Sequence, residues 1–154
     1  MDDGELLAAF EDCTLPFDQW THRAHVRIAY SYLSKHPFET AAEKIAAGIR
    51  KYNAAHKVPE GPDRGYSETT TRAFVHLVAA TVAAYRQTHR VYDSEGFCDI
   101  HPQLMSKHAL RFFYSPQRRM DPRAKATFVE PDLTGLLRIV ESYAVPFGGT
   151  PKLF

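Results

Sequence analysis

The sequence predicts an all-α fold, a single domain built as an orthogonal or up-down bundle of about five to six helices. Three observations lead to this prediction. Apolar residues recur at helical spacing in several segments, capping residues and prolines mark the ends of those segments, and no segment shows the alternation of a strand. A chain of 154 residues is long enough to bury a core, so we expect one helical domain over 1–154.

Capping residues and prolines place three helices in the first half of the chain. Leu6 and Phe10 share one face of a short first segment, which is amphipathic. Asp18 can cap the second helix, and Pro37 stops it. The expected bounds are 5–12, 18–35 and 39–55.

The second half of the chain begins with a loop, because 57–65 hold two prolines and two glycines. Pro102 suits the first turn of a later helix, whose inner face would carry Leu104, His108, Phe112 and Phe113. The two longest helices are expected to contain His25 and Val78 and to pack against each other. The expected segments are a helix over 67–87, a break at 93–98, a helix over 102–114, an ordered loop over 115–132 with a turn at 123–127, a short helix over 132–143 and an irregular tail.

Composition limits the kinds of partner. Hydrophobic residues make up 44% of the chain and charged residues 24%, as in ordinary soluble proteins. The formal net charge of +1 provides no electrostatic footprint for nucleic acid. No apolar run could span a membrane, the acidic start is unlike a signal peptide, and two cysteines do not make a disulfide framework. We therefore expect a cytoplasmic protein with a small-molecule ligand, no nucleic acid and no membrane, and a homo-oligomer is left open.

Two groups of basic residues are assigned no site role. The run of Arg118, Arg119 and Arg123 is short and is interrupted by Asp121 and Pro122. We therefore interpret it as a solvated loop, with an anion-binding role as the alternative. Four histidines fall on polar faces or in loops, and these are His56, His76, His89 and His101.

His22 and His25 lie together on the apolar side of the second expected helix. At about 100° per residue, His25 falls about 60° from His22, and both are expected to be largely buried. Arg23 and Arg27 fall on the opposite side and are expected to be exposed. The i, i+3 spacing lets two imidazoles converge on one point, as two metal ligands or as a base and its orienting partner. The alternative is a pair of core histidines that are bonded to backbone carbonyls.

The start of the longest expected helix is the second candidate region. Ser67 can cap this helix, and Glu68 lies in its first turn, beside the apolar arc. Thr69, Thr70 and Thr71 in succession are poor helix formers, which suggests that their hydroxyls are used for hydrogen bonding. The alternative is that the helix dipole alone explains an acidic residue at this position.

Three further residues are expected to contribute to the same site. Arg72 lies one turn after Glu68 and could pair with it or bind an anion. Tyr66 precedes the cap, and Asn53 ends the previous helix just before the loop that leads to Tyr66. For Asn53 the alternative is a structural role, since asparagine tolerates left-handed conformations at helix ends.

At these residues the chain resembles a family of small, uncharacterised, all-helical bacterial proteins. The family pattern runs Trp-x-His-x-x-His, Tyr-Asn, Gly-Tyr-His-Glu-Thr and Pro-Asp-Leu. In this chain the corresponding residues are Trp20, His22 and His25, Tyr52-Asn53, Gly65-Tyr66-Ser67-Glu68-Thr69 and Pro131-Asp132-Leu133. The resemblance covers most of the chain and implies a shared pocket, with little about its chemistry. Ser67 stands where the family usually has histidine, which implies altered binding or lost activity if that histidine is functional.

Three functions fit these residues. The first is a small metal-dependent or acid–base enzyme, with one pocket whose catalytic residues, and ligands for a divalent transition metal, are His22, His25 and Glu68. Its small polar substrate would be bound by Tyr66, Asn53, Thr69 and Arg72. The second is a non-catalytic module that binds a small ligand, and the third is a helical interaction protein in which these groups only join loop to helix. The sequence does not decide whether the protein is an enzyme.

Overall fold

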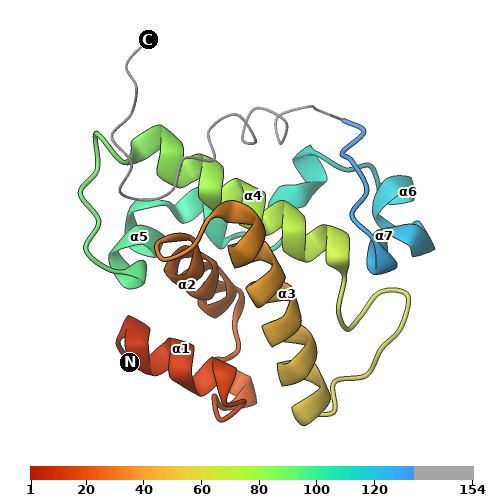
Figure 1. Ribbon diagram of the computed structural model, residues 1–154. Helices are drawn as coiled ribbons and strands as arrows, with labels where there is room; N and C mark the ends of the chain where they lie inside the picture. The colour runs from red at the N-terminus through yellow and green to blue at the C-terminus, as the bar shows by residue number, and fades with distance from the viewer. Residues whose placement is uncertain (134–154) are drawn as a thin grey trace.

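The computed structural model describes residues 1–133, whose secondary structure is helical apart from one isolated bridge between Gly61 and Arg64 (Figure 1). The α-helices are α1 (Asp3–Glu11), α2 (His22–Leu33), α3 (Phe38–Ala55), α4 (Glu68–Tyr85), α5 (Ser94–Ile100), α6 (Pro116–Arg119) and α7 (Pro122–Ala126). The 3-10 helices are η1 (Phe17–Gln19), η2 (Pro102–Met105) and η3 (Ala109–Phe112). The predicted all-α class is confirmed for the described residues. The helix expected over 132–143, apart from its first two residues, and the tail after it lie outside them.

None of the helices in this part of the chain has both the length and the apolar character that crossing a membrane requires.

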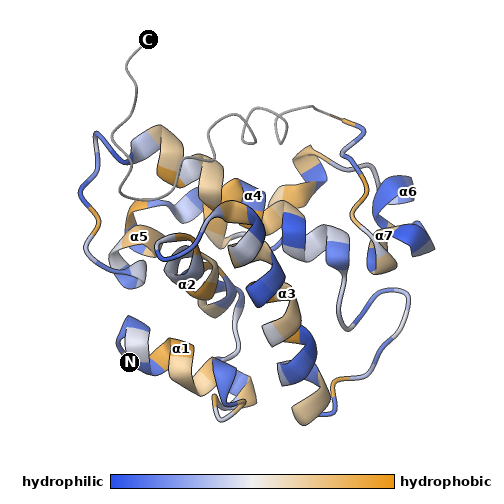
Figure 2. Cartoon of the chain, viewed as in Figure 1, coloured by the Kyte–Doolittle hydropathy of each residue, from blue (hydrophilic) through white to orange (hydrophobic). Residues whose placement is uncertain are grey.

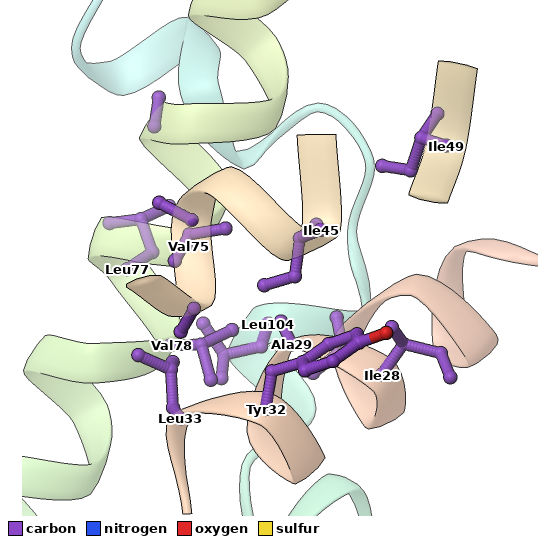
Figure 3. Packing of buried hydrophobic residues seen from close by; sticks show 14 of the residues in the cluster. Ile28, Ala29, Tyr32, Leu33, Ile45, Ile49, Val75, Leu77, Val78 and Leu104 are labelled. Atoms are coloured by element: carbon purple, nitrogen blue, oxygen red, sulfur yellow. The ribbon is translucent and has the colours of Figure 1, made fainter. Parts of the chain in front are cut away.

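The core forms where α2, α3 and α4 pack against one another. Figure 3 shows side chains from these helices gathered in one cluster, to which η2 adds Leu104. Tyr32 of α2, Ile45 of α3 and Val78 of α4 are typical members, each at most 5% exposed. Burying a side chain of this size contributes roughly 1.5–3 kcal/mol. Figure 2 shows hydrophilic and hydrophobic stretches alternating along α3, as expected of a helix with one buried face.

Capping residues set the helix starts, but the cap of α2 is not the expected one. The Ser67 hydroxyl accepts the Thr70 N–H at 3.3 Å, so α4 begins where the sequence predicts. The cap of α2 is Thr21 and not Asp18, because η1 lies before the helix. α2 is therefore 12 residues long, whereas α3 and α4 have 18 residues each. α2 and α4 pack against each other as expected, but the prediction that His25 lies in one of the two longest helices is wrong.

Residues 93–98, expected to be a break, instead open α5. The Asp93 carboxylate caps this helix by accepting the N–H of Gly96 at 2.7 Å. Phe97 is buried and stacks on Tyr30 of α2, with ring centroids 4.6 Å apart. The sequence does not predict this helix, because the helix contains a glycine and, at seven residues, is too short to show a periodic pattern.

The single helix expected over 102–114 is replaced by η2 and η3. Ser106 separates them in an extended conformation (φ −90°, ψ 116°), and its hydroxyl accepts the N–H of His108 at 3.2 Å. Leu104 is buried as expected, but His108 is exposed and Phe112 is 80% exposed. The expected inner face is therefore wrong for His108 and Phe112, because the turn at Ser106 interrupts the helical period.

The side of α2 that carries its arginines is covered by α5 and by the start of α1. Arg27 donates to the Ser94 hydroxyl at 2.7 Å. It also forms ion pairs with Asp3 at 3.2 Å and with Glu95 at 3.0 Å. The exposed fraction of the side chain is 12% for Arg27 and 34% for Arg23. The predicted exposure is wrong for Arg27 and holds only in part for Arg23, because α5 packs on this side.

Two histidines expected on polar faces or in loops are buried. His76 of α4 is 3% exposed and packs against Phe38, with ring centroids 4.3 Å apart. His101, which follows α5, is 2% exposed and packs against Phe97 at 4.8 Å. Neighbours from other parts of the chain cover both rings, and a helical wheel does not include such neighbours.

Candidate functional site

The start of α2 holds His25 in a fixed tautomer. The backbone carbonyl of Thr21 lies 2.7 Å from Nδ1 of His25. Because a carbonyl oxygen can only accept, Nδ1 carries the ring proton and Nε2 carries a lone pair. The ring also stacks on Trp20, with centroids 3.7 Å apart. Burial lowers the pKa of His25 to about 4, so its imidazole is neutral at neutral pH.

His22 is fixed through the opposite ring nitrogen. Its Nε2 donates to the backbone carbonyl of Leu104 at 2.7 Å, which leaves Nδ1 as an acceptor. Phe74 of α4 packs edge-on against the ring, with centroids 4.9 Å apart. Burial lowers the pKa of His22, and the charge of Lys107 lowers it further. Each histidine is therefore neutral and keeps one ring nitrogen without a partner in the described part of the chain.

A second polar group joins α3 to the start of α4. The Tyr66 hydroxyl donates to Oε2 of Glu68 at 2.5 Å, and Arg50 of α3 donates to the same oxygen at 2.9 Å. The Arg50 guanidinium also lies over the Tyr66 ring, 4.5 Å from its centroid. Burial, together with the hydrogen bond to Glu68, raises the pKa of Tyr66, so its phenol stays protonated. Glu68 therefore acts to position Tyr66 and Arg50.

The loop between α3 and α4 is held in shape by hydrogen bonds. Lys125 of α7 donates to the Gly61 carbonyl at 2.6 Å, and the Glu60 carboxylate accepts the N–H of Tyr66 at 3.0 Å. Gly65 lies within this loop at φ +78°, and a Cβ there would come 2.3 Å from the Glu60 carboxylate. Glycine is favoured at this position, because another residue would be strained at this φ and would displace the Glu60 carboxylate. The loop thus places Tyr66 beside α3 and α4.

α2, α3, α4 and this loop border a cavity of about 660 Å³ that is partly open to solvent. This volume is within the usual range for small-molecule sites. Much of the lining is apolar and comes from all three helices, with Val26, Ile49 and Phe74 as examples. Trp20 adds an aromatic surface beside His25. In Figure 1 the loop after α3 runs around one side of the helices that form this cavity.

Four of the residues predicted for the site line the cavity, and these are His22, His25, Asn53 and Tyr66. The side-chain amide of Asn53 has no hydrogen-bond partner within residues 1–133, so it is free to donate and to accept. Glu68, Thr69 and Arg72 are not part of the lining. The structure therefore brings the two histidines together with Asn53 and Tyr66 and leaves these three α4 residues outside the lining.

Thr69 and Arg72 make structural contacts that differ from the substrate-binding role predicted for them. Thr69 is 3% exposed, and its hydroxyl donates to the Thr127 carbonyl at 2.9 Å and accepts the Val129 N–H at 3.0 Å. Arg72 forms an ion pair with Glu39 of α3. Both side chains therefore tie α4 to its neighbours.

The predicted set of metal ligands, His22, His25 and Glu68, is not assembled. Within residues 1–133, no group of three or more His, Cys, Asp and Glu side chains is placed to hold a metal ion. Oε2 of Glu68 already accepts from Tyr66 and Arg50, and the guanidinium beside it would repel a cation. Two imidazoles alone leave a tetrahedral centre short of ligands.

Three cavity residues are absent from the site predicted from the sequence, and these are Trp20, Lys107 and Arg119. Thr70 and Thr71, whose hydroxyls are predicted to form hydrogen bonds, also line the cavity. Trp20 lies two residues before His22 in the chain, and this closeness could have predicted that it belongs to the site. Nothing in the sequence distinguishes Arg119 from the other two arginines of the run. In the structure Arg118 bonds to the Glu130 carbonyl at 2.9 Å and Arg123 pairs with Asp121. Arg119 instead lines the cavity, and its Nε is buried without a partner in the described residues. The interpretation of a solvated basic loop is therefore wrong for Arg119.

No protein-family model, curated protein or solved structure matches the chain. Its resemblance to the family of small helical bacterial proteins therefore stays a prediction that rests on the motifs alone. The chemistry of the site is inferred from the contacts of its own residues.

Proposed function

We propose that the protein binds a small organic molecule in the cavity between α2, α3 and α4. One observation carries this proposal, namely that residues with unsatisfied polar atoms line a largely apolar cavity. They are His25 through Nε2 and Asn53 through its amide, both on half-buried side chains, and Arg119 through Nε, which is buried; none of the three has a partner within residues 1–133. Polar groups in folded proteins are nearly always hydrogen-bonded when buried. A ligand with an apolar body and polar substituents would complete these contacts.

Two other functions receive less support. An interaction protein would use its polar groups to join loop to helix, as Thr69 does, and would gain nothing from a cavity of about 660 Å³. A metal-dependent enzyme needs a third ligand, and Glu68 is committed to Tyr66 and Arg50. Binding of a small molecule uses the cavity and its unsatisfied atoms together.

Acid–base catalysis in the same cavity is a second candidate, and His25 is the residue that favours it most. A neutral imidazole with a fixed tautomer and a bare Nε2 is the arrangement of a general base. A pKa of about 4 makes it a weak base at neutral pH. Hydrolysis of 4-nitrophenyl acetate that is lost in His25→Gln and kept in His108→Gln would favour catalysis. Equal rates in both variants would leave His25 as a binding residue.

The binding proposal is testable with the neutral fluorescent probe N-phenyl-1-naphthylamine. Trp20 is the single tryptophan of the chain and lines the cavity, so energy transfer from it to the probe reports occupancy. We expect saturable binding of one probe per chain, with quenching of Trp20. The probe's N–H is also a donor for Nε2 of His25.

A pair of variants on α3 separates cavity binding from surface binding. Ile49→Phe fills part of the cavity and should weaken probe binding at least tenfold, the effect of losing about 1.4 kcal/mol. Ala47→Phe introduces the same side chain at an exposed position of the same helix and should leave binding unchanged. Thermal unfolding shows whether each variant is folded. Equal affinity in both variants, or no energy transfer from Trp20, would overturn the proposal.

A further inference from the structure

The cavity lining is unequal in charge. Among residues 1–133, four cationic residues line it, namely Arg64, Lys107, Arg119 and Lys125, against one carboxylate, Asp63. His22 and His25 do not change this balance, because both are neutral. A cavity with mostly apolar walls and several cations favours ligands that carry a negative charge.

The cations differ in whether the protein already uses them. Nζ of Lys125 is engaged by the Glu60 carboxylate at 3.2 Å and by the Gly61 and Arg64 carbonyls at 2.6 and 2.5 Å. Lys125 therefore holds the loop and has little left for a ligand. Arg119 is the opposite case, because its Nε is buried and has no hydrogen-bond partner within residues 1–133.

An unpaired buried guanidinium nitrogen is unusual and needs an explanation. Buried donors without a partner are costly, and charged donors more so. The neighbouring Arg118 does have a hydrogen-bond partner, because its Nε donates to the Glu130 carbonyl at 2.9 Å. The unpaired Nε of Arg119 is explained if a ligand in the cavity accepts a hydrogen bond from it.

Lys107 strengthens the positive charge at the same place. It lines the cavity, is exposed, and has no hydrogen bond or ion pair within the described residues. The charges of Arg111, Lys107 and Arg119 lower the pKa of His108, and Lys107 also lowers that of His22. Lys107, Arg119 and His22 all line the same cavity.

We propose that the ligand is an organic anion, with its carboxylate, sulfonate or phosphate group held by Arg119 and Lys107 and its apolar body against the helices. This inference rests on the proposed binding function and adds the chemical class of the ligand. Arginine suits the role because its planar fork can form two parallel hydrogen bonds to such a group. The apolar lining excludes a bare inorganic anion as the preferred ligand, since such an ion would leave that surface uncovered.

The test compares two probes that differ only in charge. 8-Anilinonaphthalene-1-sulfonate is N-phenyl-1-naphthylamine with a sulfonate group added, so the ratio of their affinities isolates the anionic group. We expect the sulfonate to bind at least tenfold more tightly, and this advantage to shrink in 1 M salt. Arg119→Met should lower the affinity for the anionic probe roughly ten- to hundredfold, as expected for a charged hydrogen bond.

Three controls keep the result interpretable. Arg119→Met should leave binding of the neutral probe unchanged, which also shows that the variant is folded. Arg123→Met removes an exposed arginine that is paired with Asp121, and it should change neither affinity. Lys107→Met, at an exposed position, should weaken only the anionic probe, by severalfold.

The outcomes separate the two proposals. If both probes bind equally well and Arg119→Met has no effect, the anion subsite is wrong and the binding function stands. If Arg119→Met and Arg123→Met weaken the sulfonate equally, the effect comes from general surface charge and the subsite is again wrong. If neither probe reaches the cavity, both proposals fail.

Discussion

The polar residues on the two sides of α2 differ in how completely their hydrogen-bonding atoms are paired. On the side facing α5, Arg27 contacts Asp3 and Glu95, and Arg23 contacts Glu95 and Asp99. On the side facing the cavity, His22 and His25 each bond to one backbone carbonyl through one ring nitrogen. Their other nitrogens have no partner in the described residues.

This difference separates groups that hold the fold from groups available to a ligand. Charges that are paired and partly buried are costly to remove, because removal strands their partners. Polar atoms left unpaired beside a cavity contribute little to stability, and proteins accept such a cost at functional sites. We therefore expect substitutions on the arginine side to lower stability, and substitutions on the cavity side to lower ligand binding.

Removing Arg27 should have the largest effect on stability. Arg27→Met leaves Asp3 and Glu95 without their cation and the Ser94 hydroxyl without its donor. We expect the free energy of unfolding to fall by about 2–4 kcal/mol, measured by urea denaturation. Arg123→Met removes a side chain that is 76% exposed, and it should leave the free energy of unfolding unchanged within error. Equal effects of the two substitutions would contradict the claim that the partly buried ion pairs of Arg27 stabilise the fold more than the exposed pair of Arg123 does.

His25 should make the protein sensitive to acid. Its folded pKa of about 4 lies below the ordinary value near 6.5, so the unfolded state binds more protons between these values. Stability contributed by neutral His25 is full above about pH 6.5 and should decline by roughly 3 kcal/mol as the pH falls to 4. His25→Gln cannot titrate and should flatten this part of the curve. If the stability of the unsubstituted protein and of His25→Gln falls in parallel with pH, the pKa of His25 is not lowered by folding.

Gly65→Ala should have a smaller effect and should act on the wall of the cavity. The added Cβ would be strained at φ +78° and would push the Glu60 carboxylate away from the Tyr66 N–H. We expect a loss of about 1 kcal/mol of stability together with weaker binding of N-phenyl-1-naphthylamine. Gly4→Ala, in α1, is the matched control and should leave binding unaltered. Full probe binding in Gly65→Ala would mean that the loop does not shape the cavity.

Asn53→Leu should change stability least. The Asn53 amide has no side-chain partner in residues 1–133, so replacing it with an apolar group of similar size should change the free energy of unfolding by less than about 0.5 kcal/mol. Binding of a ligand that hydrogen-bonds to the amide should weaken, as titration of Trp20 fluorescence would show. A loss of more than about 2 kcal/mol of stability would reveal a structural role for Asn53.

The sequence predicts the parts of the fold that depend on local periodicity. The apolar stripes of α2, α3 and α4 are long enough to show a helical period, and Ser67 marks the start of α4. α5 is missed because seven residues that include a glycine show no such pattern. The same omission explains the error at Arg27, since its partner Glu95 lies on α5.

The candidate site is predictable to the extent that it follows from the wheel of a single helix. His22 and His25 share the inner side of α2, and that side faces the cavity. At the start of α4 the wheel fails, because it cannot tell that Arg50 engages Glu68 or that Thr127 engages Thr69. These partners come from elsewhere in the chain.

The structure of the protein with 8-anilinonaphthalene-1-sulfonate bound, determined by crystallography, tests the central claim most directly. The claim is that the unpaired polar atoms beside the cavity belong to a ligand site. We expect the aromatic body of the probe between α2, α3 and α4 near Trp20, and a sulfonate oxygen within about 3 Å of a guanidinium nitrogen of Arg119. A probe bound only outside the cavity, with Nε of Arg119 still unpaired, would contradict the claim.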